Sequence, residues 1–172
     1  MGKILGIIGG GQLGMMLTEA AKSMPLDISK IIVLDPTENC PASKVGAEQI
    51  VADFKDESSI RELAERSDII TYEIESGNST VLKKLEPTCQ INPSPETLEI
   101  IQDKLTQKKF LSDNGIPVSR FSEVSSKIEE FGLPILLKTR RDAYDGRGNF
   151  KITSVEQISD ALNLFEGRSL MV

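Results

Sequence analysis

A lysine, an arginine and several glycines cluster between two apolar runs in the last third of the sequence. Lys138 directly follows the apolar run Ile135–Leu137, and the stretch Gly146–Gly148 leads into a second run, Phe150–Ile152. Ammonium and guanidinium groups supply positive charge, and glycines let the backbone approach a ligand closely. This combination predicts a polyphosphate site on a loop between two strands. A solvent-exposed β-hairpin without a ligand is the alternative that the spacing leaves open.

The residues around this glycine loop predict a domain boundary before it and a helix and a strand after it. Ser94 and Pro95 are suited to start a helix, so a domain boundary is expected there. A capping box of Ser154 and Gln157 predicts a last helix. The run Leu170–Val172 is expected to form an unpaired, exposed strand edge. The predicted buried face of the last helix consists of Val155, Ile158, Leu162 and Phe165.

A second glycine cluster follows the first apolar run of the chain. Gly9, Gly11 and Gly14 satisfy the pattern GxGxxG between a strand predicted for Lys3–Ile8 and a predicted helix. A tight turn needs glycine, and the free N–H groups at a helix amino terminus attract an anion. Asp35 follows the next predicted strand about 20 residues later, where dinucleotide-binding proteins hold a ribose hydroxyl. The pattern indicates an NAD site, or glycines that only permit close packing of strand and helix.

Strand and helix patterns alternate through the first half of the sequence. Repeated β-α-β units predict a doubly wound parallel sheet, in which ligands bind at the carboxyl ends of the strands. Glu73 and Glu75 follow one of these strands and are candidates for ligand contacts, although acidic residues there are usually solvated. The predicted strands are Lys3–Ile8, Ile31–Leu34, Ile50–Val51, Ile69–Tyr72 and Gln90–Asn92.

The composition excludes several classes of protein. The 172-residue chain has a net charge of -6, which argues against nucleic acid or an anionic membrane as the main partner. It has neither an apolar run long enough to span a membrane nor a signal-peptide pattern, so the cytoplasm is expected. Cys40 and Cys89 lack metal-site spacing and are expected to be reduced. The absence of histidine excludes a Ser-His or Cys-His nucleophile within the chain.

Motifs spread over the whole chain resemble those of ATP-grasp enzymes, and most closely those of the N5-carboxyaminoimidazole ribonucleotide synthetases. In chain order the motifs are GGGQLG, DP, TYE, NPSPETL, QDKLTQKKFL, GIPV, ILLKT and YDGRGN. The resemblance implies an α/β fold, with a Rossmann-like, acceptor-binding preATP-grasp domain at residues 1–95. It also implies the small α+β lobe of an ATP-grasp domain at residues 96–172, truncated because family members are longer.

The resemblance further implies a reaction and its ligands. Family members are usually homodimers that use ATP, Mg2+ and bicarbonate to carboxylate 5-aminoimidazole ribonucleotide in purine biosynthesis, through carboxyphosphate. ATP binding is implied for Lys104, Lys138, Tyr144, Asp145, Gly146, Arg147, Gly148 and Asn149. Acceptor binding is implied for Gly11, Gln12, Leu13 and Glu73. Catalytic roles are implied for Tyr144, Asp145 and Arg147, and no metal ligand is expected within this chain.

The sequence departs from the family pattern at four positions. Met15 and Lys104 stand where arginine is common, Ala143 where glycine is common, and Asn149 where glutamine is common. Lysine keeps the positive charge at position 104 but loses the planar fork of arginine. Two alternatives stay open: an NAD(P)-dependent oxidoreductase that uses the first glycine cluster, and a non-catalytic nucleotide-binding module. The chain by itself is expected to be an inactive fragment of the ligase.

Overall fold

The computed structural model describes residues 2–124, 128–143 and 146–172. The chain divides into two compact units, Met1–Glu99 and Ile100–Val172, here called unit 1 and unit 2. The predicted domain boundary near residue 95 falls at the first residue of helix α5 (Pro95–Ile101), which runs from one unit into the other. Each unit has a sheet of its own.

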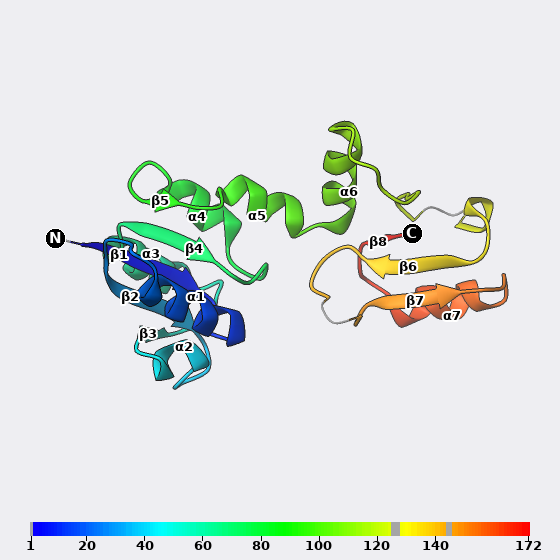
Figure 1. Ribbon diagram of the computed structural model, residues 1–172. Coiled ribbons are helices and arrows are strands. Elements are labelled where there is room, and N and C mark those ends of the chain that lie inside the picture. Colours follow the sequence, from blue (N-terminus) through cyan, green and yellow to red (C-terminus); the bar gives the residue numbers. More distant parts are fainter. Residues whose placement is uncertain (1, 125–127, 144–145) are drawn as a thin grey trace. The chain divides into compact units, whose positions relative to one another are not determined.

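A five-stranded parallel sheet forms the centre of unit 1 (Figure 1). Its strands are β1 (Lys3–Ile8), β2 (Ile28–Asp35), β3 (Glu48–Val51), β4 (Ile69–Tyr72) and β5 (Gln90–Ile91). The strand order is β3-β2-β1-β4-β5, so the direction of winding reverses between β1 and β4. The predicted doubly wound sheet is therefore confirmed, and β1 and β4 have the predicted ends.

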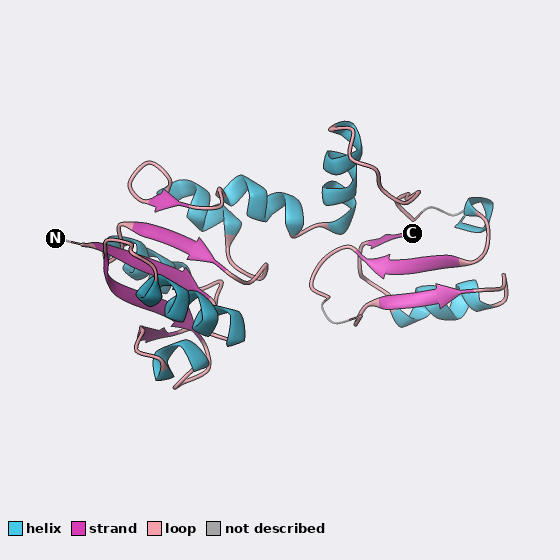
Figure 2. Cartoon of the chain, in the orientation of Figure 1, coloured by secondary structure: helices cyan, strands magenta, loops and turns pink. Residues whose placement is uncertain are grey.

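Helices pack on both faces of this sheet (Figure 2). They are α1 (Gln12–Ser23), α2 (Pro41–Lys44), α3 (Glu57–Glu65) and α4 (Ser79–Leu85). Buried residues of α1 and α2 form a cluster with Ile7 of β1, whereas Leu63 of α3 packs against Gly6 on the opposite face. Asp56 and Asn78 start α3 and α4, because their side chains accept first-turn N–H groups at 2.8 and 3.1 Å.

An antiparallel hairpin and a short third strand form the sheet of unit 2, in the order β7-β6-β8. Its elements are α6 (Lys104–Asp113), the 3-10 helix η1 (Ile128–Phe131), β6 (Ile135–Thr139), β7 (Asn149–Ile152), α7 (Gln157–Leu164) and β8 (Leu170–Met171). One face of β6 buries Ile135 and Leu137 in a cluster with Ala161 of α7 and Phe165. The predicted pair of strands joined by a glycine loop is confirmed.

The prediction of an unpaired strand at Leu170–Val172 is wrong. β8 pairs with β6, and Val172 exchanges two backbone hydrogen bonds with Ser122, at 3.0 and 2.9 Å. Met171 and Val172 are 1% and 9% exposed. The pairing escaped sequence reasoning because Ser122 lies far earlier in the chain, in an irregular segment without a strand pattern.

The start of the last helix also differs from the prediction. α7 begins at Gln157, whose Oε1 atom accepts the backbone N–H of Thr153 at 2.8 Å. The Ser154 hydroxyl does not close a capping box, because it hydrogen-bonds Glu156. Val155 consequently lies in the turn before the helix and is 58% exposed, not buried as predicted.

Two further sequence predictions concern the cysteines and the membrane. Cys40 and Cys89 are both buried and free, as expected for reduced thiols. Cys40 packs tightly on the first glycine cluster, since a Cβ atom at Gly10 would lie 2.5 Å from its sulfur. Within the three described ranges, every helix is too short or too polar to cross a membrane.

Candidate functional site

The first glycine cluster forms a tight loop between β1 and α1. Gly9 has a φ of +103°, a conformation that favours glycine, and its N–H donates to the Leu34 carbonyl at 2.9 Å. A Cβ atom at Gly14 would lie 2.3 Å from the Gly9 carbonyl oxygen, so α1 packs directly on the loop backbone. Two of the three motif glycines are therefore required by the close approach of loop and helix.

Asp35 holds this loop in place. Its side chain is 5% exposed, and its two carboxylate oxygens accept the N–H groups of Gly10 and Thr37, each at 2.8 Å. A carboxylate that is buried and bonded to the loop leaves no open face for a ribose hydroxyl. The geometry therefore argues against the NAD alternative, which needs Asp35 to point at a ligand.

Replacement of Asp35 by asparagine is expected to loosen the glycine loop. The asparagine amide group would face a backbone N–H that needs an acceptor, and a buried N–H without a partner costs about 1–3 kcal/mol. We expect lower hydrogen-exchange protection of the Gly10 amide and a lower thermal unfolding midpoint. Asp53→Asn is the matched control, because Asp53 also accepts an N–H two residues later, at 2.8 Å, but at an exposed position. Equal protection of the Gly10 amide in Asp35→Asn and wild type would contradict this role.

Glu73 lies next to the loop, directly after β4. Its backbone N–H donates to the Ile8 carbonyl at 3.0 Å, which places it where the winding of the sheet reverses. A Cβ atom at Gly9 would lie 2.4 Å from the Glu73 Oε1 atom, and one at Gly11 would lie 3.6 Å away. Partial burial raises the pKa of Glu73, the Gly11 N–H acts in the opposite direction, and the charge of Asp35 adds to the increase.

The predicted acceptor residues are thus partly brought together by the structure. Gly11 lies beside the Glu73 carboxylate, and Gln12 and Leu13 form the exposed first turn of α1. Leu13 is 56% exposed, so its apolar side chain is accessible to a ligand. Together these residues offer N–H donors, a carboxylate and an apolar surface at the carboxyl ends of β1 and β4, where doubly wound sheets bind ligands.

Unit 2 contains a cavity beside β6 that is lined by residues of the exposed face of this strand and by core residues such as Ile135 and Val172. Leu136 and Lys138 point to this face, since side chains alternate along a strand, and Leu136 is 43% exposed. The cavity has a volume of about 240 Å³. It is lined by Lys108, Ser119, Arg120, Phe131, Pro134, Ile135, Leu136, Lys138, Met171 and Val172. These described lining residues combine three cationic side chains with an apolar wall and include no acidic one, which suits a flat apolar ligand with negative charge.

The glycine loop begins two residues after Lys138. Gly146 and Gly148 have φ angles of +76° and +80°, and a Cβ atom at Gly148 would lie 2.4 Å from the Thr139 hydroxyl oxygen. Arg147 is exposed, and Asn149 is the first residue of β7, paired with Lys138 across the hairpin. The other two residues predicted for this loop, Tyr144 and Asp145, lie outside the described residues.

Lys104 contacts the loop and is not among the residues that line the cavity. Its N–H donates to the Arg140 carbonyl at 2.9 Å, and its ammonium group donates to the Ala143 carbonyl at 3.0 Å. The structure therefore brings Lys104 to the start of the glycine loop. Ala143 participates through its backbone, which alanine supplies as well as glycine does.

Sequence reasoning missed Lys108 and Arg120. The lysines at positions 104, 108 and 109 are typical of an exposed helix face, yet Lys108 lines the cavity, bonds the Ser119 hydroxyl and lies 5.7 Å from the Phe121 ring centre. The guanidinium group of Arg120 lies 4.2 Å from the ring centre of Phe131. The spacing of four residues between Lys104 and Lys108 places both on one side of α6 and was the available signal. Arg120 lies in an irregular segment, where no periodicity predicts its direction.

A family model decides where the chain belongs. Residues 1–102, more than half of the chain, match the ribonucleotide synthetase preATP-grasp domain. The chain belongs to this family. Residues 109–172 of this ribonucleotide synthetase family member match the ATP-grasp domain model. Both parts of the predicted resemblance are therefore confirmed.

Known relatives are similar in sequence and structure to nearly the whole of this chain. The N5-carboxyaminoimidazole ribonucleotide synthase of Staphylococcus epidermidis is 37% identical over 171 residues, which cover 96% of this chain and 45% of that protein. The structure of the Staphylococcus aureus synthetase with ADP is 35% identical, with a TM-score of 0.90, over 99% of this chain and 47% of that one. The Aspergillus clavatus synthase, solved with ADP and 5-aminoimidazole ribonucleotide, is 31% identical, with a TM-score of 0.87, over 99% and 45%. The chain spans about half the length of the curated relatives it matches.

Proposed function

We propose that the protein containing this chain is a carbon–nitrogen ligase that carboxylates 5-aminoimidazole ribonucleotide. ATP and bicarbonate are the other substrates, and N5-carboxyaminoimidazole ribonucleotide, ADP and phosphate are the products, as a step of purine biosynthesis. The observation that carries the proposal is the cavity of unit 2, where three cations and an apolar wall suit a nucleotide. The names and bound ligands of the relatives support the choice of substrates.

The nucleotide is proposed to lie against β6 and the glycine loop. Lys138 and Lys104 would contact the phosphates. Gly146 and Gly148 would approach them through the backbone, and Arg147 and Asn149 through their side chains. Charge-assisted contacts of this kind hold a phosphate more tightly than neutral hydrogen bonds do. Of the residues proposed for catalysis, Arg147 would stabilise the charge of the transferring phosphoryl group, together with Tyr144 and Asp145.

The acceptor is proposed to lie at the glycine loop of unit 1. The N–H of Gly11 and the first turn of α1, with Gln12 and Leu13, would contact it, and Glu73 would accept hydrogen bonds from its N–H or O–H groups. A bicarbonate oxygen attacks the γ-phosphorus of ATP. This attack releases ADP and forms carboxyphosphate. The acceptor amine then attacks the carboxyl carbon, releases phosphate and loses one proton.

Mg2+ is proposed to accompany ATP, as polyphosphate chemistry commonly requires. Among the residues that the structure describes, no group of three or more acidic or thiol side chains could hold a metal ion. We therefore assign no step to an ion held by these residues. A homodimer is a further proposal that rests on the family resemblance, and a cytoplasmic location is one that rests on the sequence pattern.

Turnover of ATP by the full-length protein is expected to depend on the acceptor. Release of phosphate should require both 5-aminoimidazole ribonucleotide and bicarbonate, because bicarbonate accepts the phosphoryl group and the bound ribonucleotide is expected to complete a site that excludes water. A phosphate-release assay with each substrate omitted in turn tests this, with wild-type protein and no ATP as the background. Equal turnover without the ribonucleotide would exclude the proposed reaction, and tight binding of NADH would favour the oxidoreductase.

A further inference from the structure

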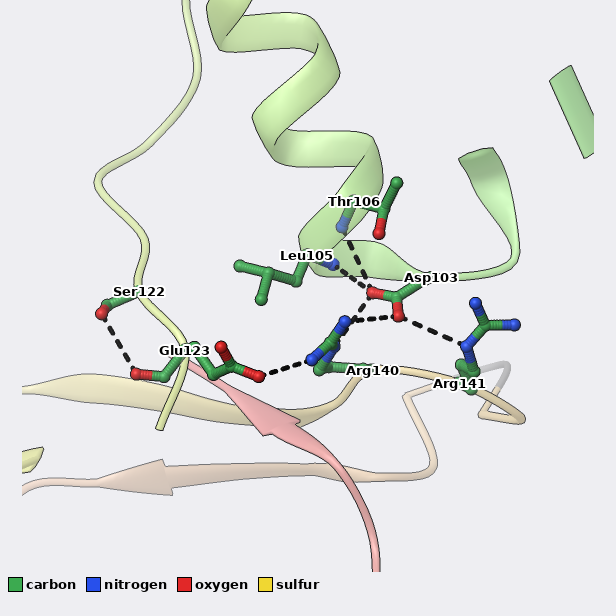
Figure 3. Close-up of polar contacts among 7 residues, drawn as sticks. All are labelled: Asp103, Leu105, Thr106, Ser122, Glu123, Arg140 and Arg141. Carbon is green, nitrogen blue, oxygen red and sulfur yellow. Dashed lines mark hydrogen bonds and ion pairs between the residues drawn. The ribbon is translucent and has the colours of Figure 1, made fainter. Parts of the chain in front are cut away.

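Asp103 joins the start of α6 to the end of β6 (Figure 3). Its side chain is 5% exposed, and one carboxylate oxygen accepts the N–H groups of Leu105 and Thr106 at 3.0 and 3.2 Å. The same carboxylate accepts two bonds from the Arg140 guanidinium group, at 3.0 and 2.7 Å. One buried side chain therefore caps a helix and binds a strand end in a two-point contact.

Arg140 is fixed by its backbone as well. Its N–H donates to the Ser169 carbonyl at 2.8 Å, its carbonyl accepts the Lys104 N–H at 2.9 Å, and its side chain reaches Glu123 at 2.6 Å. The next residue, Arg141, contacts Asp103 at 3.3 Å. Asp103, Arg140 and Arg141 thus hold the first residues of the glycine loop against α6, and these three residues are called the clamp. The position of Lys104 relative to Lys138 depends on this clamp.

The clamp also balances charge. Arg140 and Arg141 open the loop, the Lys104 ammonium group bonds the Ala143 carbonyl, and the Arg168 guanidinium group bonds the Arg141 and Asp142 carbonyls, so several cationic side chains gather there. Burial would raise the pKa of Asp103, but the bonds from Arg140 and the helix N–H groups outweigh it and place the pKa below its usual value. Asp103 therefore stays ionised at neutral pH and, together with Glu123, offsets the repulsion among these cations.

We propose that Asp103 is a positioning residue for the nucleotide phosphates. It acts through Arg140 and the Lys104 backbone, and it sets Lys104, Lys138 and the glycine loop at the spacing that a polyphosphate needs. The inference rests on the proposed function, because it assumes that these lysines bind ATP. Small displacements of binding groups have large effects on turnover, which makes such a role measurable.

The test is the kinetics of Asp103→Asn in the full-length protein. Asparagine still offers an oxygen to cap α6 but removes the charge that holds Arg140. We expect the KM for ATP to rise about tenfold or more, with the KM for the ribonucleotide unchanged. Glu123→Gln is the matched control, because it removes the exposed second partner of Arg140 and should change neither constant appreciably. A purely structural role would lower the thermal unfolding midpoint and the active fraction without a selective change in the KM for ATP, and that result would overturn the inference.

Arg140→Lys provides a second variant that leaves the helix cap intact. Lysine keeps the charge but loses the two-point contact, so the KM for ATP should again rise selectively. In the double variant, Asp103→Asn should add little to the effect of Arg140→Lys, since both substitutions break the same contact between Asp103 and Arg140. Independent, additive effects would overturn the inference. If wild-type protein fails to bind ATP, the proposed function itself fails, whereas normal wild-type binding with unaffected variants rejects only the role of Asp103.

Discussion

Lys138→Ala is expected to weaken ATP binding by the full-length protein about tenfold to a hundredfold. Lys138 points from β6 into the cavity of unit 2, whose described lining residues include no acidic side chain that could pair with it. A hydrogen bond to a charged group contributes about 1.5–3 kcal/mol, which corresponds to this loss of affinity. Isothermal titration with ATP and with ADP measures it directly.

Lys109→Ala is the matched control, because Lys109 lies on the same unit at an exposed position outside the cavity lining. Adenosine separates the two parts of the ligand, since its binding should survive Lys138→Ala if the ammonium group contacts phosphate. Equal losses for the two lysine variants would show that the strand and loop form only a solvent-exposed hairpin. Equal losses for ADP and adenosine would show that Lys138 supports the cavity and does not contact phosphate.

The strands of unit 1 could be predicted because their signal is local. The runs Lys3–Ile8 and Ile69–Tyr72 are apolar, bounded by glycine or polar residues, and observed with the predicted ends. The start of α3 at Asp56 is also local, because this side chain reaches only three residues ahead. β8 was mispredicted because its partners lie far away in sequence, and a short apolar run does not reveal what it pairs with.

At the candidate sites too, motifs of neighbouring residues could be predicted from sequence, whereas contacts between residues far apart in the chain could not. GxGxxG predicted a ligand loop, yet the same glycines suit a dinucleotide, a different acceptor or close packing of strand and helix. The distinction came from Asp35, whose carboxylate faces Gly10 and Thr37 in the folded chain. Asp103 and Arg140 are 37 residues apart, and no spacing rule relates them. Long-range side-chain contacts therefore determine which chemistry a recognisable loop supports.

Glu73→Gln is expected to weaken acceptor binding while it stabilises the fold. The KM for 5-aminoimidazole ribonucleotide in the full-length protein should rise about tenfold or more, since a charged acceptor of hydrogen bonds is replaced by a neutral amide. Glu75→Gln is the matched control, because Glu75 follows the same strand but is exposed. Unchanged KM values in both variants would exclude Glu73 from the acceptor site.

The effect of Glu73→Gln on stability should depend on pH in a defined direction. Burial raises the folded-state pKa of Glu73 above its ordinary value of 4.5, so the folded protein disfavours the charged form. As the pH rises above the ordinary value, the unfolded state ionises first, so the free energy of unfolding falls until the pH has passed the folded-state pKa. Well below the ordinary value Glu73 is protonated in both states and does not change the free energy of unfolding. The thermal unfolding midpoint of Glu73→Gln should be higher than that of wild type near pH 8 and equal to it near about pH 4. A higher midpoint for wild type near pH 8 would show that the fold stabilises the charged form of Glu73. The pKa of Glu73 would then be lowered rather than raised.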